Sequence, residues 1–284
     1  MRKILVTLLA CIMSVAFSLG IGVMASAEST TEGTPFSTVT NNPNSLGSAT
    51  VTGGQTGPWD VNLNSSYGEA DSRLYYGEDN APYIMDLRTF SMKFVIDELA
   101  TNATMKISFL EDQNQFPMDG YGTGFSLMLT DDANKGLIVK GISHPTNANF
   151  QAWYLVYDNS QPRVEDYRDR EILLEMYPEA GKFLHIHMNF TSPCNTTVDF
   201  HAQYPLTEDF DYTRSILFFN LQDNKGSDVN IDINEIKGIR ASDATEPTYP
   251  VPEVVWELDK KAPFTTYGDF VGNVAVHKNE ETGY

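Results

Sequence analysis

The chain has 284 residues, and its 19 Lys and Arg stand against 38 Asp and Glu, so the formal net charge is -19. A phosphate backbone is bound by clustered cations, so this balance argues against a nucleic-acid partner. It also disfavours adsorption to an anionic membrane surface. Hydrophobic residues make up 41% of the chain, which is enough to build a packed core.

Residues 1–27 have the pattern of a secretory signal peptide. Arg2 and Lys3 precede an apolar run over residues 4–24, and Ala25-Ser26-Ala27 forms a small-x-small cleavage site. We therefore expect a secreted or cell-surface protein with no membrane insertion after cleavage, and the style of the signal resembles that of Gram-positive bacteria. Two alternatives are an uncleaved anchor, because about 20 apolar residues can span a bilayer, and lipid attachment at Cys11.

The segments on either side of residues 58–240 differ from them in composition. Residues 28–57 are rich in Ser, Thr and Gly and contain no Lys or Arg, which predicts a disordered spacer. Residues 241–284 begin with three prolines in a short stretch, which predicts an extended C-terminal extension, with edge strands as an open alternative. Cys194 is the one cysteine after residue 27, so an intramolecular disulfide is excluded in the exported chain.

Between residues 58 and 240 the hydrophobic period is two, which predicts strands rather than helices. Apolar and polar residues alternate over 90–97 and 105–109, whereas 137–142, 150–157 and 216–221 are apolar on both faces, as central strands are. Turn-forming Asn, Asp and Gly separate these segments. We predict an all-β, two-sheet antiparallel β-sandwich.

Three alternating segments, 171–177, 183–190 and 198–204, are predicted to form an antiparallel meander. Burying every apolar residue on one face fixes which residues share the other face. Our register places Met176 opposite Leu184 and Met188 opposite Phe200. On the polar face the pairs that it predicts include Glu175 with His185 and His187 with His201.

This polar face brings three of the five histidines of the chain together with carboxylates. Imidazole and carboxylate are ligands of zinc and similar ions. The sequence therefore predicts a candidate metal site, with zinc as one candidate ion, at Glu175, His185, His187 and His201. Two alternatives stay open, a solvated sheet face that binds nothing and a sugar-binding surface whose polar groups hydrogen-bond hydroxyls.

Aromatic rings that face solvent can stack on sugars while their polar edges hydrogen-bond. The candidates are Trp153 and Tyr157, which share one strand face, and Tyr75 and Tyr76, which lie at a predicted loop edge. The alternative is that these rings belong to the core, as most aromatic residues of a sandwich do. No catalytic residue is predicted: the sequence has no Gly-x-Ser-x-Gly motif, and its carboxylate pairs follow no discriminating pattern.

The segments 90–97, 122–129 and 229–236 resemble strands of extracellular β-sandwiches, namely concanavalin A-like lectin and glucanase domains and jelly-roll carbohydrate-binding modules. The resemblance covers about residues 60–240 and is one of pattern. It implies a concanavalin A-like or jelly-roll fold, and it makes Asp232 a candidate ligand of a structural calcium. The Glu-x-Asp-x-x-Glu signature of the related glucanases does not occur here.

The function expected from these observations is binding of a glycan or cell-wall polysaccharide by a non-catalytic, exported sandwich. One alternative is a glycoside-active or metal-dependent hydrolase that uses Glu175, His185, His187 and His201. A second alternative is a structural or adhesive surface domain with a protein partner.

Overall fold

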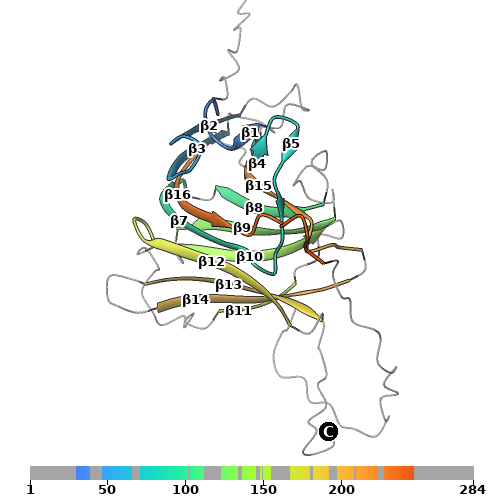
Figure 1. The fold of residues 1–284 in the computed structure, drawn as a ribbon. Helices are drawn as coiled ribbons and strands as arrows, with labels where there is room; N and C mark the ends of the chain where they lie inside the picture. The colour runs from blue at the N-terminus through green and yellow to red at the C-terminus, as the bar shows by residue number, and fades with distance from the viewer. Residues whose placement is uncertain are drawn as a thin grey trace, which may run out of the picture.

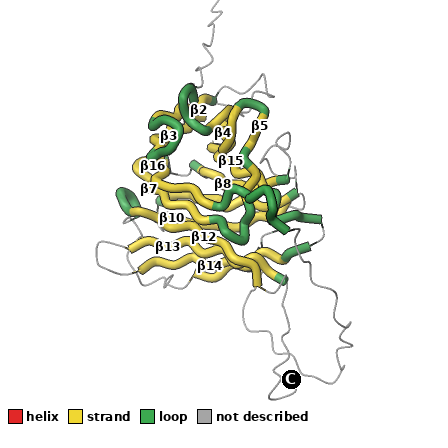
Figure 2. Tube along the Cα trace, in the orientation of Figure 1, coloured by secondary structure: helices red, strands yellow, loops and turns green. Residues whose placement is uncertain are grey.

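The structure is a computed structural model that describes residues 30–38, 47–65, 71–101, 103–111, 123–133, 136–144, 148, 150–154, 167–179, 182–191, 197–207, 209–222 and 227–245. These residues form strands, turns and loops without a helix, as Figures 1 and 2 show. Within them, accordingly, no helix is long and apolar enough to cross a membrane. The predicted signal peptide, Tyr157 and Cys194 lie outside the described residues.

The described strands form two antiparallel sheets (Figure 1). The first sheet has the strand order β1 (Phe36–Thr38), β4 (Asp71–Glu78), β15 (Ser215–Gln222), β8 (Thr104–Leu110), β9 (Gly124–Asp132) and β10 (Gly136–His144), with β5 (Ala81–Pro82) beside β4 and β6 (Ile84–Met85) beside β15. The second sheet has the order β11 (Gln151–Tyr154), β14 (Thr197–Pro205), β13 (Phe183–Thr191), β12 (Glu171–Glu179), β7 (Ser91–Leu99), β16 (Ser227–Lys237), β3 (Trp59–Ser65) and β2 (Ser48–Thr52).

The core lies between the two sheets, because each strand turns alternate side chains toward the other sheet. In β7, Met92, Phe94 and Ile96 are fully buried, while the residues between them are half-buried. Phe125 of the first sheet packs on Tyr204 of the second, with ring centroids 4.8 Å apart. The predicted all-β, two-sheet antiparallel sandwich is confirmed.

Two of the three predicted central strands lie at sheet edges instead. The apolar runs 137–142 and 150–157 were expected in the middle of a sheet, and 216–221 likewise. Residues 215–221 of β15 are indeed all buried within the first sheet. Among the described strands, however, β10 and β11 each end their sheet. In β10 burial alternates, because Leu137 and Val139 are buried while Lys140 between Val139 and the next buried position is exposed, so the core covers one face of this strand. Hydrophobic content does not say how many neighbours a strand has.

The spacer prediction for residues 28–57 is wrong for two of its segments, which form β1 and β2. Phe36 is buried and its ring meets Trp59 edge-on, with centroids 5.3 Å apart. Ala49 and Val51 alternate into the same core. Three apolar residues at the right positions suffice to extend two sheets whose pairing partners already exist, although the average composition of the segment is that of a disordered chain.

The predicted C-terminal extension is described only as far as residue 245. This short stretch is attached to the sandwich by arginine side chains. Arg88 donates hydrogen bonds to Thr245, and Arg240 donates one to the Ala244 carbonyl. The rest of the predicted extension lies outside the described residues.

Candidate functional site

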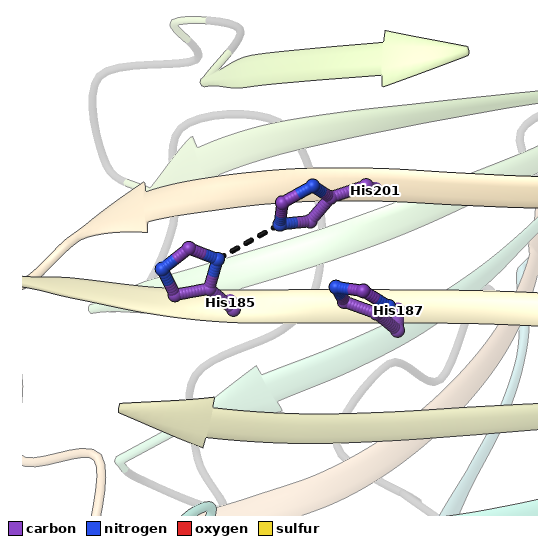
Figure 3. Close-up of side chains that lie close together, drawn as sticks. All are labelled: His185, His187 and His201. Atoms are coloured by element: carbon purple, nitrogen blue, oxygen red, sulfur yellow. Dashed lines mark hydrogen bonds between the residues drawn. The ribbon is translucent and has the colours of Figure 1, made fainter. Parts of the chain in front are cut away.

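Three histidines converge on the face of the second sheet that is turned away from the core. His185 and His187 are two residues apart on β13, so their side chains leave the same face. His201 is the direct partner of His187 on β14, as predicted. Figure 3 shows the three imidazoles around a common space above the two strands.

The ring nitrogens of this histidine cluster (His185, His187 and His201) are close enough to share one ion. One nitrogen from each ring lies within 4.8 Å of the other two. Nδ1 of His185 and Nε2 of His201 are joined by a hydrogen bond of 2.8 Å. The rings of His187 and His201 have centroids 4.3 Å apart.

Two residues of β12 complete the surroundings of the cluster, and our sequence analysis had not selected either of them. The Glu179 carboxylate accepts a hydrogen bond of 2.6 Å from Nε2 of His185. The Tyr177 ring stacks on His185, with centroids 4.8 Å apart and planes within 4°. Its hydroxyl is hydrogen-bonded to Nε2 of His187 at 3.3 Å.

These partners differ from the expected ones because our register for β12 and β13 was wrong by two residues. Glu175 lies opposite His187 rather than His185, and Tyr177 takes the position opposite His185. A slip of two residues keeps every side chain on its face, so the apolar pattern cannot distinguish the two registers. The strand also continues through Pro178, beyond the end of the predicted segment 171–177. Continuing the alternation past Pro178 would have found both missed residues.

Proline is tolerated at this position because β7 pairs with β12 only up to Glu175. Beyond that point one edge of β12 has no ladder partner among the named strands, so the missing N–H of Pro178 breaks no sheet hydrogen bond there. The strand therefore reaches Glu179, which brings this carboxylate to His185.

The surroundings of His201 favour its neutral form. Burial lowers the pKa of His201, the neighbouring His187 and His185 lower it further, and Asp199 acts in the opposite sense. His201 therefore stays neutral to a lower pH than a free histidine. The neutral ring is the form that binds a metal through its nitrogen lone pair.

Asp232, the calcium candidate, lies away from the histidine cluster. It is an exposed residue of β16 whose direct partner on β3 is Asp60. Asp97 of β7 is close enough that Asp232, Asp169 and Asp60 raise its pKa, although burial is the larger cause. The strand of Asp232 is separated from β13 by β12 and β7, so Asp232 is not brought together with the histidines.

The predicted aromatic platform is not formed by Tyr75 and Tyr76. Each residue is only 6% exposed. Tyr76 packs in the core against Phe36, and Tyr75 packs against Phe218 on the other face of β4. Both lie within a strand that has sheet neighbours on each side rather than at a loop edge, and their ring faces are covered.

The other two aromatic candidates lie where less is described. Trp153 belongs to β11, and its backbone pairs with that of His201. Tyr157 lies outside the described residues. In place of the predicted rings, the described part of the sheet face carries Tyr177, which is 43% exposed.

The chain was compared with known proteins at the level of sequence and structure. No protein-family model matches the sequence. The search of curated proteins likewise found no relative. The fold class, a two-sheet antiparallel β-sandwich, is therefore assigned from the strand pairing of the structure itself.

Solved structures with a similar arrangement include carbohydrate recognition domains. The exoplasmic/lumenal domain of VIP36 in its Ca²⁺/Man3GlcNAc-bound form matches with a TM-score of 0.43 and 10% identity, over 72% of this chain and 91% of that chain. The metal-free carbohydrate recognition domain of Emp46p matches with a TM-score of 0.37 and 12% identity, over 70% and 88%. That of Emp47p matches with 0.29 and 11%, over 75% and 93%.

Proposed function

We propose that the protein is an exported, non-catalytic β-sandwich that binds a glycan on the outer face of β12, β13 and β14. The observation that supports this best is Tyr177, an exposed aromatic residue that is held in place both at its ring and at its hydroxyl. Its ring is stacked on His185, and its hydroxyl is hydrogen-bonded to His187. A platform that is already ordered loses little side-chain entropy when a ligand binds.

The chemistry around Tyr177 suits a sugar. A pyranose ring presents an apolar face that stacks on an aromatic ring and hydroxyls that need donors and acceptors. By register, the side chains of Glu175, His187 and Asn189 share the face of Tyr177, and His187 and Asn189 are half-buried. Trp153 of the neighbouring strand β11 is a further candidate, because its backbone is paired with that of His201 on β14.

The proposed location is outside the cell, and a cell-wall polysaccharide is one class of ligand found there. The signal-peptide pattern of residues 1–27 supports export. The formal net charge of -19 supports a soluble protein that stays off anionic surfaces, so a neutral polysaccharide fits better than a polyanion.

A glycan array of the purified protein tests this function. We expect selective binding that falls about tenfold or more in Tyr177→Ala, since a stacking contact contributes about 1.4 kcal/mol. Tyr177→Phe is the matched control, because it keeps the ring and removes only the hydroxyl. An array on which neither the unmodified protein nor Tyr177→Phe binds would refute the proposal and leave a protein partner as the next candidate.

A second candidate function is a metal-dependent hydrolase, and the histidine cluster is the observation that favours it. Three protein ligands with an open fourth position are the arrangement of catalytic zinc sites. Incubation of polysaccharides with the zinc-loaded protein distinguishes the two functions. New reducing ends that require both zinc and His187 would establish hydrolysis, whereas binding without cleavage would exclude it for those substrates.

A further inference from the structure

The histidine cluster has a second property that does not depend on glycan binding. We propose that His185, His187 and His201 bind one divalent transition-metal ion, with zinc as the preferred ion, and that Glu179 orients the site from outside the coordination shell. The inference rests on the positions of the three imidazoles and on the hydrogen bond from His185 to Glu179.

The sheet itself sets the distances between the ligands. His185 and His187 are i and i+2 neighbours on β13, and His201 is directly opposite His187 on β14. Such positions place side chains about 5–7 Å apart at their Cβ atoms, and imidazoles extend from there to a common point. The result is three ligand nitrogens within 4.8 Å of one another on two neighbouring strands.

The spacing of the nitrogens is close to that of a tetrahedral zinc site. With Zn–N distances of about 2.0–2.1 Å, tetrahedral ligand nitrogens lie about 3.3 Å apart. Nδ1 of His185 and Nε2 of His201 are 2.8 Å apart with a proton between them. For an ion to take the place of this proton, His201 carries its proton on Nδ1 instead of Nε2, so that the ring stays neutral. The two rings also separate by about 0.5 Å, which small side-chain rotations supply.

Glu179 determines which nitrogen of His185 faces the ion. A carboxylate only accepts hydrogen bonds, so the contact of 2.6 Å requires a proton on Nε2 of His185. In the neutral ring the lone pair is then on Nδ1, which is the nitrogen that faces His201. A histidine whose outer nitrogen donates to a carboxylate is the usual second-shell arrangement of protein zinc sites.

The ligand set selects the class of metal. Three neutral imidazoles suit zinc, copper, nickel and cobalt, whereas calcium and magnesium require oxygen ligands. His185 is only 7% exposed, and the other two rings are half-buried, so the cluster is open on its solvent side. A water molecule or a ligand oxygen completes the shell there.

Titration calorimetry of the purified protein after dialysis against a chelator tests the site, with no glycan present. We expect about one Zn²⁺ per chain, with an affinity that excess Ca²⁺ does not change. Co²⁺ provides an independent readout, because a tetrahedral three-histidine site gives visible absorption bands much stronger than those of hydrated Co²⁺. Absence of zinc binding by the folded, unmodified protein would overturn the proposal.

Three variants and a control assign the ion to these residues. Glu179→Gln keeps the ligands and is expected to weaken zinc binding about 10- to 100-fold. His187→Gln and His201→Gln each remove a ligand and are expected to cost more than Glu179→Gln. His277→Gln makes the same chemical change outside the described residues and is expected to bind zinc as the unmodified protein does.

These results also separate the metal site from the proposed glycan function. Unchanged zinc affinity in both His187→Gln and His201→Gln, with folding checked by circular dichroism, would refute the assignment even if zinc binds elsewhere. Zinc binding with a blank glycan array would leave the metal site standing without the glycan function. Glycan binding without zinc binding would show the reverse.

Discussion

Replacement of Phe125 by alanine tests whether the two sheets share the core that supports the candidate site. Phe125 is fully buried on β9, and four aromatic rings surround it at centroid distances of 4.8–6.0 Å. One of these rings is Tyr204 of β14, the strand that carries His201. Tyr204 also donates a hydrogen bond of 3.1 Å to the Gly124 carbonyl, beside Phe125.

The expected loss of unfolding free energy follows from these contacts. A buried Phe→Ala substitution costs about 3–5 kcal/mol. Each aromatic pair adds about 0.5–1.5 kcal/mol beyond its buried area, and the neighbours of Phe125 come from several elements that cannot all move into the cavity. We therefore expect a loss of about 4–5 kcal/mol, in the upper part of this range.

Urea unfolding followed by circular dichroism measures this loss through the shift of the midpoint at constant slope. Phe125→Leu keeps most of the volume and is expected to cost about 1.5 kcal/mol. Ile239→Ala, at a residue that is 52% exposed, is expected to stay within about 0.5 kcal/mol of the unmodified protein. A loss below about 1 kcal/mol for Phe125→Ala, with cooperative unfolding, would contradict the shared core.

Three further predictions concern charge, backbone and metal. Burial, and then neighbouring carboxylates such as Asp232, raises the pKa of Asp97. The contribution of the protonated Asp97 carboxyl to folding stability is therefore fully present below the pKa of a free aspartate, and it is lost as pH rises through the folded pKa. Asp97→Asn should therefore raise stability at neutral pH and flatten its decline with pH in low salt, and an unchanged profile would contradict this. Gly124→Ala should cost about 1–3 kcal/mol or prevent folding, because φ is +139° and the added Cβ would lie 2.0 Å from the Phe109 carbonyl oxygen; wild-type stability in thermal unfolding would contradict this backbone. Free Zn²⁺ at about 100 times its dissociation constant should raise unfolding free energy by about 2.7 kcal/mol, and the same gain in His187→Gln would place the ion elsewhere.

The period of two in the sequence was enough to predict the two-sheet class and the faces of the strands. It works because one-residue slips expose apolar side chains and are therefore strongly disfavoured. The pairing of His187 with His201 was predicted correctly for this reason. The sites of Phe36 and Val51 could not be predicted, since isolated apolar residues in a polar segment gain burial only from strands far away in the sequence.

The surroundings of the histidines were less predictable than the histidines themselves. Two-residue slips of β12 leave the apolar face unchanged, so the choice depends on the conformation of a short hairpin and on whether Pro178 can lie in a strand. Glu179 and Tyr177 followed from that choice. The aromatic candidates failed for a different reason, because Tyr75 and Tyr76 occupy successive positions of one strand and each face of that strand is covered.

The hairpin between β12 and β13 gives the chain a simple way to change this surface in steps. The spacing of the three imidazoles depends only on β13 and β14, whereas their neighbours Tyr177 and Glu179 belong to β12. Insertion or deletion of two hairpin residues would slide β12 along β13 and exchange one set of neighbours for another without moving a histidine. The length of this loop thus determines which side chains of β12 lie beside the histidines, while the imidazole nitrogens keep their positions on β13 and β14.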